Sequence, residues 1–317
     1  MTTIVTLTVN PAVDVSTSVG RVRPVHKLRC APSRRDPGGG GINVARVAKR
    51  FDADVLSIFP IGGPIGHLLH RLLEQEGVPS LTVSIAEDTR EDFTVLESES
   101  GEQYRFVLPG PALREAEWRA CLNALTSLKE SPRFAIGSGS LPPGVHEDFY
   151  GQVAQATRKT GGKVIIDTSG PPLRKALEAG IYLVKPSLRE MRELTGESLE
   201  TEYTCIEASR RLIAAGSAEV VALTLGHYGA LLVTRDLLLR ANALPIKPVS
   251  TVGAGDSFLG AMVVRLAAGK GLEDAFRYGV AAGSAALLAP GTDLCQREQV
   301  ERLLSNVTVQ TLSSVTT

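Results

Sequence analysis

Thr251-Val252-Gly253-Ala254-Gly255-Asp256-Ser257 is the stretch that says most about the fold of this chain. It runs directly into an apolar pattern typical of a helix face, at Phe258, Met262, Val263 and Leu266. Two glycines at a helix start leave backbone N–H groups free to bind an anion. Since Asp256 would repel that anion, its place here favours a base that takes a proton from an attacking hydroxyl. The alternative is a glycine turn in which Asp256 caps the helix.

A second glycine stretch, Gly38-Gly39-Gly40-Gly41, also runs into a helical pattern, at Ile42, Val44, Val47 and Ala48. A flexible linker is the simple interpretation. A linker has no reason to end in a helix, however, whereas only glycine lets a backbone lie directly against a sugar. Asn43 can donate to and accept from a pair of sugar hydroxyls. We therefore predict a loop that approaches a ligand.

Apolar strand patterns alternate with helical patterns along most of the chain. The strand patterns are residues 4–9, Val55–Phe59, Phe134–Ile136, Val164–Ile166, Tyr182–Val184, Val220–Leu225 and Leu231–Thr234. The helical patterns are Ile42–Arg50, His67–Gln75, Trp118–Leu128, Asp148–Thr160, Leu188–Leu194, Ile206–Ala214, Ser257–Ala268 and Glu273–Ala289. This alternation is typical of a doubly wound α/β fold, with a mostly parallel sheet and helices on both faces. We expect one domain over residues 1–305 and a frayed, polar tail over 306–317.

Two segments, about 12–36 and 89–108, break this alternation and look like antiparallel strands. Phe93–Glu97 and Tyr104–Leu108 flank a Glu99–Glu102 turn, as in a hairpin. We expect the two segments to form one small β-sheet that stands off the main domain. It could cover a cleft as a lid, pair two subunits, or do both. Its apolar residues, which we expect to be exposed, are Val13, Val15, Phe93 and Val95.

The composition excludes several classes of protein. Lys and Arg number 34, as do Asp and Glu, so the zero net charge argues against non-specific binding to nucleic acid or to a membrane surface. The four cysteines form no C-x-x-C pair, which favours reduced thiols. No G-x-x-x-x-G-K-[ST] stretch is present, so this is not a P-loop protein. The N-terminus lacks the basic segment of a signal peptide, and we expect a cytoplasmic protein.

Four charged residues stand alone in the two lid segments: Asp14, Lys27, Arg90 and Arg105. Contact with solvent is the ordinary interpretation of any one of them. Arg105 lies in the middle of a strand pattern, in Tyr104-Arg105-Phe106, where a guanidinium needs a partner. A phosphate monoester would supply one with matching fork geometry.

Taken in order, the motifs resemble those of the ribokinase-type (PfkB) carbohydrate kinases, from Ile4 to about Leu303. They are Asn10-Pro-Ala-Val-Asp14, Lys27-Leu-Arg-Cys30, Gly38–Gly41 with Asn43, Gly101-Glu-Gln-Tyr-Arg105-Phe106, Gly139-Ser-Leu-Pro-Pro-Gly144, Lys185-Pro186, Leu225-Gly226 and Gly253–Ser257. Within the family, the PfkB-type 6-phosphofructokinases are the most similar. The resemblance implies a ribokinase-like fold whose β-sheet lid pairs two subunits. It also implies that ATP phosphorylates the 1-hydroxyl of fructose 6-phosphate, a reaction of glycolysis. Tagatose 6-phosphate or fructose 1-phosphate is the alternative substrate, and a sugar-phosphate-binding regulator without turnover is a more distant alternative.

The resemblance also implies roles for individual residues. Asp256 corresponds to the catalytic base, and Gly253, Ala254 and Gly255 to the anion hole for the migrating phosphoryl group. The positions that hold the sugar phosphate are Asp14, Lys27, Gly39, Gly40, Asn43, Arg90, Arg105 and Ser140. The nucleotide would lie against Lys185, Ser187, Thr224, Gly226, Gly229 and Ser284.

Two ions are implied as well. Mg²⁺ would arrive with ATP and be positioned partly through Glu190, and K⁺ would bind near the carbonyls of Ser250, Val252, Ala286, Ala289 and Gly291. The family's Asn-x-x-Glu appears here as Ser187-Leu-Arg-Glu190, and Asp293 stands where relatives tend to be basic.

Overall fold

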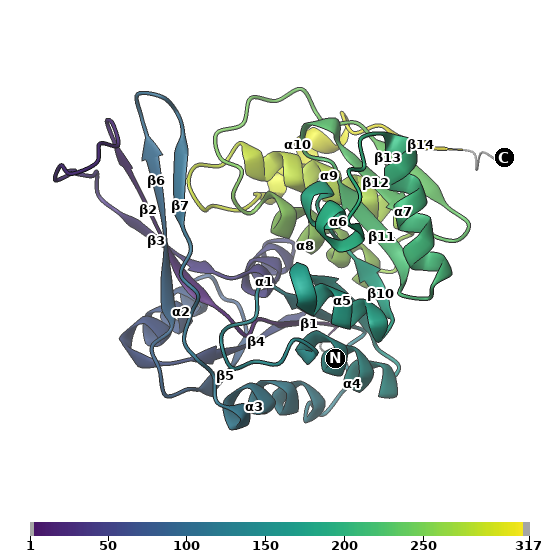
Figure 1. The fold of residues 1–317 in the computed structure, drawn as a ribbon, viewed down its shortest axis with the longest axis horizontal. Coiled ribbons are helices and arrows are strands. Elements are labelled where there is room, and N and C mark those ends of the chain that lie inside the picture. Colours follow the sequence, from purple (N-terminus) through teal and green to yellow (C-terminus); the bar gives the residue numbers. More distant parts are fainter. Residues whose placement is uncertain (1–2, 313–317) are drawn as a thin grey trace.

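A central sheet organises the structure, a computed structural model that describes residues 3–312 (Figure 1). In these residues ten strands lie in the order β14-β13-β12-β11-β10-β9-β8-β1-β4-β5. Neighbours from β5 to β11 pair in parallel, as predicted; these strands are β1 Ile4–Leu7, β4 Val55–Ile61, β5 Ser80–Ser84, β8 Phe134–Ser138, β9 Lys163–Asp167, β10 Ile181–Val184 and β11 Ala218–Thr224. An antiparallel edge follows, made of β12 Ala230–Val233, β13 Leu238–Ala241 and β14 Val309–Thr311.

Helices cover both faces of this sheet, because successive side chains of each buried strand point to opposite sides. Ile4 of β1 belongs to one core cluster and Val5 to the other. The first cluster includes residues of α1 Gly40–Arg50, α2 Gly63–Gln75, α8 Ala254–Ala267, α9 Leu272–Leu287 and α10 Arg297–Leu304. The second includes residues of α3 Glu115–Thr126, α4 Phe149–Lys159, α5 Gly170–Glu178, α6 Leu188–Thr195 and α7 Glu202–Ala214. The doubly wound fold is therefore confirmed.

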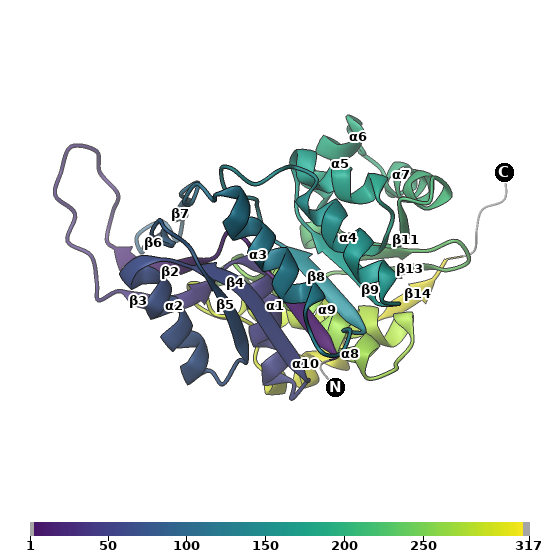
Figure 2. The same ribbon diagram turned by 90° about the horizontal axis from the view of Figure 1, so that it is seen from below.

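A second, smaller sheet stands beside the central one and forms the lid (Figure 1). Its order is β3-β2-β6-β7, with β2 Ala12–Val19, β3 Arg34–Gly38, β6 Arg90–Glu97 and β7 Gln103–Phe106. β2–β3 and β6–β7 are antiparallel pairs, as the two segments predicted. The segments themselves join in parallel, along β2 and β6. The loop between β2 and β3 projects away from the rest of the molecule (Figure 2).

The apolar residues of the lid are distributed differently from the prediction. Val13 and Val15 are buried in the core cluster that contains Leu69 of α2, so the expectation that they are exposed is wrong. The helix α2 packs against β2 and β3 and covers that part of the sheet. The exposed apolar side chains of the lid lie on β6, β7 and the residues after it: Phe93, Phe106, Val107 and Leu108.

The C-terminal segment is more regular than its composition suggests. Val309–Thr311 pairs with β13, so the expectation of a frayed chain from residue 306 is wrong for these residues. A ladder uses backbone groups, and a polar, Thr-rich segment is suited to the exposed edge of a sheet. Residues 313–317 lie outside the described part. Within residues 3–312, no helix combines the length and apolar character needed to cross a membrane.

Candidate active site

Two cavities adjoin at the carboxyl ends of the central parallel strands. The larger has a volume of about 720 Å³ and the smaller about 440 Å³. Ser187, Thr224 and Gly255 line both, so the two cavities meet at these residues. Ligands of doubly wound folds bind at this end of the sheet.

The smaller cavity is lined mostly by polar groups from strand ends and two helix starts. Residues 138–140 begin at the last residue of β8, residues 167–169 begin at the last residue of β9, and Lys185 follows β10. Gly40 begins α1 and Gly255 lies in the first turn of α8. The predicted loop therefore reaches the cavity. A Cβ on Gly40 would lie 2.2 Å from Ser138 Oγ, so the glycine here makes room for protein atoms.

The predicted helix start after Gly253 is present. Gly253 has φ 73°, and a Cβ there would lie 2.6 Å from Leu294 Cδ2, so glycine is needed for both its conformation and its lack of a side chain. The helix α8 begins at the next residue, Ala254. Its first N–H groups have no partner within the helix, and they lie where the cavities meet.

Asp256 does not cap α8. Its Oδ2 instead accepts a hydrogen bond of 2.8 Å from Nδ2 of Asn43, in α1, and the capping interpretation is wrong. Burial raises the pKa of Asp256 above its ordinary value, although the hydrogen bond from Asn43 and the positive charges of Lys185 and Arg105 act to lower it. A carboxylate that is partly desolvated beside an anion site has the character of a general base.

Lys185 and Asp167 form a buried pair in the same cavity. Lys185 Nζ lies 3.2 Å from Asp167 Oδ1, and 3.3 Å from the place that a Cβ on Gly255 would take. Burial raises the pKa of Asp167 to about 6, although the positive charge of Lys185 acts to lower it. Burial acts to lower the pKa of Lys185, but Asp167, Glu190 and Asp256 raise it overall. A charged ammonium therefore stands beside the anion hole.

The larger cavity has mainly apolar walls, with Leu244, Ile246, Pro248, Val280 and Leu287 among them. Of the residues predicted to hold the nucleotide, it is lined by Ser187, Thr224, Gly226, Gly229 and Ser284. Lys185 lines the smaller cavity instead. Apolar walls that lead to polar groups at one end suit a planar base with a charged chain.

Ser187 and Glu190 close the first turn of α6 by hydrogen-bonding to each other's backbone. Ser187 Oγ accepts from the Glu190 N–H at 3.3 Å, and Glu190 Oε2 accepts from the Ser187 N–H at 2.8 Å. Serine is a preferred residue at this position, so the departure from asparagine leaves the helix start intact. Glu190 also lines the smaller cavity with Asp167 and Asp256. Carboxylate oxygens are the ligands that Mg²⁺ prefers, but in residues 3–312 no group of three or more His, Cys, Asp or Glu side chains is arranged to hold a metal ion, so Glu190 could contribute to an Mg²⁺ site only alongside the nucleotide phosphates.

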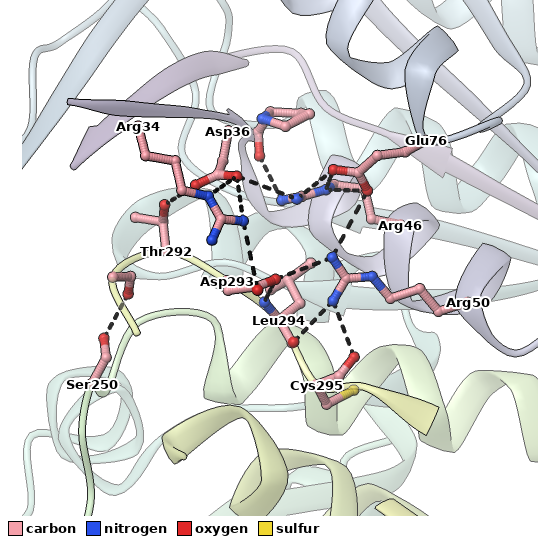
Figure 3. Close-up of polar contacts among 12 residues, drawn as sticks. Arg34, Asp36, Arg46, Arg50, Glu76, Ser250, Thr292, Asp293, Leu294 and Cys295 are labelled. Atoms are coloured by element: carbon pink, nitrogen blue, oxygen red, sulfur yellow. Dashed lines mark hydrogen bonds and ion pairs between the residues drawn. The ribbon is translucent and has the colours of Figure 1, made fainter. Parts of the chain in front are cut away.

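Of the residues predicted to hold K⁺, hydrogen bonds join Ser250, Val252 and Gly291. Ser250 Oγ donates to the Gly291 carbonyl at 2.7 Å, and the Val252 N–H donates to Ser250 Oγ at 3.2 Å. Carbonyl and hydroxyl oxygens suit a hard cation. Asp293 points elsewhere: its carboxylate lies 3.1 Å from Arg50 and 3.5 Å from Arg34 (Figure 3).

Asp14 of β2 and Arg90 of β6 lie on the two central strands of the lid sheet. Burial, together with the charge of Asp92, raises the pKa of Asp14 to about 7, while the charge of Arg105 acts to lower it. Arg90 donates through its terminal nitrogens to the Leu108 and Asn10 carbonyls. Its buried Nε has no partner in the described residues. Most of this guanidinium therefore supports the lid.

Arg105 and Lys27 are placed very differently from Arg90. Arg105 pairs with Thr94 in the β6–β7 ladder, and its side chain has no ion pair within residues 3–312. Its charge acts on both Asp14 and Asp256. Lys27 is exposed in the projecting loop between β2 and β3 (Figure 2). The structure does not bring Lys27 to the other predicted residues.

Three residues of this site escaped the sequence reasoning: Asn10, Arg46 and Asp167. Asn10 Nδ2 donates to both the Pro109 carbonyl and Ser140 Oγ, each at 3.1 Å. Arg46 donates to Asn43 Oδ1 at 3.2 Å. Asp167 had a usable signal, since it is a carboxylate directly after a buried strand, where parallel sheets bind ligands. Asn43, predicted as a sugar ligand, has both ends of its amide engaged by Asp256 and Arg46.

Comparison with known proteins agrees with this geometry. The pfkB family carbohydrate kinase profile matches residues 5–299. An ATP-dependent 6-phosphofructokinase isozyme 2 of Mycobacterium tuberculosis is 48% identical over 299 residues, which cover 94% of this chain and 88% of that protein. A 1-phosphofructokinase of Bacillus subtilis is 30% identical over 309 residues, covering 98% and 100%. The crystal structure of phosphofructokinase-2 from Escherichia coli in complex with potassium superposes with a TM-score of 0.92, at 40% identity over 96% of this chain and 99% of that one. The chain belongs to the pfkB family of carbohydrate kinases.

Proposed function

We propose that this chain is an ATP-dependent 6-phosphofructokinase, which converts fructose 6-phosphate to fructose 1,6-bisphosphate. The observation that carries the proposal is the position of Asp256 next to the free N–H groups of α8, where the apolar and polar cavities meet. The similarity to proteins named 6-phosphofructokinase isozyme 2 supports the choice of substrate.

The reaction follows from this arrangement. Asp256 accepts the proton of the sugar 1-hydroxyl, and the oxygen forms a bond to the γ-phosphorus as the bond to the bridging oxygen of ADP breaks. Negative charge grows on the transferring oxygens and is stabilised by the N–H groups of Gly253, Ala254 and Gly255 and by the Lys185 ammonium. Mg²⁺, when bound with ATP, neutralises phosphate charge, and Glu190 and Asp167 would hold it.

The lid supplies the recognition of a phosphorylated sugar. Arg105 carries a charge that no carboxylate of residues 3–312 pairs with, and this charge acts on both Asp14 and Asp256. A phosphate monoester on the sugar would satisfy that guanidinium through two parallel hydrogen bonds. With an unphosphorylated sugar bound, the Arg105 guanidinium would contact only solvent.

The test is ATP consumption by the purified protein with fructose 6-phosphate, tagatose 6-phosphate or fructose 1-phosphate as acceptor. We expect the highest kcat/KM with fructose 6-phosphate. Preference for fructose 1-phosphate would instead favour a 1-phosphofructokinase, the activity of the B. subtilis relative. Binding of a sugar phosphate without ATP consumption would identify a regulator.

We also propose a homodimer joined through the lids. Phe93 of β6 and Phe106 of β7 are paired in register, and both are exposed, at 39% and 55%. Aromatic residues on a sheet edge favour association. Sedimentation at micromolar concentration tests this, and a monomer would contradict it. Lys27 can contribute to a sugar site only if the projecting loop folds inward or reaches the partner subunit in such a dimer.

K⁺ is the cation that we propose for the oxygen-rich site at Ser250 and Gly291. The support is the convergence of their oxygens and the relative crystallised in complex with potassium. Activity measured in K⁺ and in tetramethylammonium buffers of equal ionic strength tests the proposal. Equal kcat and KM in the two buffers would refute it.

A further inference from the structure

Arg46 connects the elements around Asp256 although it lines neither cavity. It lies in α1, one turn after Asn43, and is 1% exposed. Its Nη1 donates to Asn43 Oδ1 at 3.2 Å and to the Pro37 carbonyl of β3 at 2.8 Å. Its Nη2 and Nε donate to Glu76, the residue after α2, at 2.6 and 2.9 Å (Figure 3). One side chain thus contacts the lid, the end of α2 and the partner of Asp256.

These contacts determine which way the Asn43 amide faces. A guanidinium has only donors and a carboxylate only acceptors, so each end of the amide has one compatible neighbour. With its oxygen towards Arg46, the amide directs Nδ2 at Asp256 Oδ2, where the distance is 2.8 Å. Rotating the amide would set its oxygen against the Asp256 carboxylate and its NH₂ against the guanidinium. Without Arg46, Asn43 Oδ1 loses its hydrogen-bond donor in the described residues, and the Asp256 carboxylate alone still favours this orientation of the amide.

We propose that Arg46 is a positioning residue for phosphoryl transfer: it holds the Asn43 amide, and through it the carboxylate of Asp256, in the orientation that accepts the sugar proton. The inference rests on the proposed role of Asp256 as the base. Since the same guanidinium bonds the Pro37 carbonyl, the lid strand β3 and the catalytic carboxylate share one anchor.

The first test replaces Arg46 by glutamine. We expect kcat to fall by about 10- to 100-fold, by analogy with the loss that follows removal of a residue that orients a metal ligand. The KM for ATP should be little changed, because Arg46 does not reach the larger cavity. Arg46→Lys keeps the charge but not the planar fork, and should recover only part of kcat.

Loss of stability has to be separated from loss of orientation. Arg46→Gln leaves the Glu76 carboxylate without its close partner, which destabilises the fold. The double variant Arg46→Gln/Glu76→Gln removes that unpaired charge and should regain stability against urea. Because it still lacks the donor to Asn43, its kcat should stay low. Recovery of kcat together with stability would overturn the proposal.

A second measurement does not need turnover. Asp256 is faced by Asn43 and Arg46 from α1, Lys185 from the end of β10, Arg105 from β7 and Asp167 from the end of β9. Loss of Arg46 removes one positive charge and frees the Asn43 amide, so the pKa of Asp256 should rise. ¹³C-carboxyl NMR of labelled aspartate measures this, with Asp256→Asn to assign the signal. The acid limb of the kcat–pH profile should move to higher pH with it.

Arg265 offers a matched control. It forms two hydrogen bonds to one carboxylate, Asp274, at 2.6 and 3.1 Å, and lies at the far end of the helix that begins beside Asp256. Arg265→Gln should leave kcat and the pKa of Asp256 unchanged. An unshifted pKa of Asp256 in Arg46→Gln would overturn the inference. Wild-type protein that consumes no ATP with any of the three sugars would refute the proposed function, whereas the NMR titration would still decide the role of Arg46.

Discussion

Arg105→Ala tests whether the lid recognises a phosphate, and the structure makes the variant easy to interpret. The side chain is exposed and has no ion pair within residues 3–312, so its removal leaves no buried charge behind. Hydrogen bonds to charged groups contribute about 1.5–3 kcal/mol each. With about 1.4 kcal/mol per tenfold change in affinity, the KM for fructose 6-phosphate should rise about 10- to 100-fold.

The assay compares fructose 6-phosphate with fructose in the same variant. The KM for ATP should barely change, because Arg105 does not line the larger cavity. Fructose never used the contact, so discrimination between the two sugars should shrink by the same factor. Arg105→Lys should recover only part of the loss, since lysine lacks the fork. Arg35→Ala, at a lid arginine with half of its side chain exposed, is the control and should change neither KM.

The reasoning is refuted if both sugars are weakened equally. Arg105 would then support the lid rather than bind phosphate, as most of the Arg90 guanidinium does through the Leu108 and Asn10 carbonyls. The argument for a phosphorylated substrate would then rest only on the comparisons with known proteins.

Four further outcomes are expected. Asp256→Asn should lower kcat by about 10²–10⁴-fold with ATP affinity kept, and a near-normal kcat in steady-state assays would contradict the proposed base. Ser187→Asn should keep its activity and helix stability, because asparagine caps helices as well as serine; a large loss of turnover would mean that Ser187 acts on the metal. The pKa of Asp14 is raised from 3.8 to about 7 in the native state, so the native state binds more protons and stability falls as pH rises between these values; Asp14→Asn should reduce that slope in urea unfolding at pH 5 and 8, while the raised pKa of Asp167 keeps part of it. Phe106→Asp should convert the dimer to monomers in sedimentation, and an unchanged mass would place the interface elsewhere.

The sequence predicts those parts of the fold that local patterns control. Buried strands such as β11 contain continuous apolar runs, here Val220–Leu223, and α8 is a largely buried, mainly apolar helix that follows a glycine turn. Short or polar elements give no such signal. β14 is held by backbone pairing with β13, which any sequence compatible with an extended edge can make. The exposure of Val13 and Val15 was mispredicted because strand periodicity does not say which helix will pack on a sheet.

The functional site was harder to predict from the sequence than the fold. Asp256 could be proposed as the base from the sequence alone, because it lies within five residues of the glycines that open the helix. Its partner Asn43 lies 213 residues earlier, and both its amide chemistry and the resemblance gave it the role of a sugar ligand. Arg46 gives no local signal at all: in the sequence it is one of many arginines on a helix. Its importance comes from the packing of α1 against β3 and the end of α2, which buries the guanidinium where carboxylate, carbonyl and amide oxygens converge. Burying an arginine is favourable only when such partners surround it. A fully enclosed arginine one turn from a catalytic contact is therefore the kind of residue that only a structure reveals.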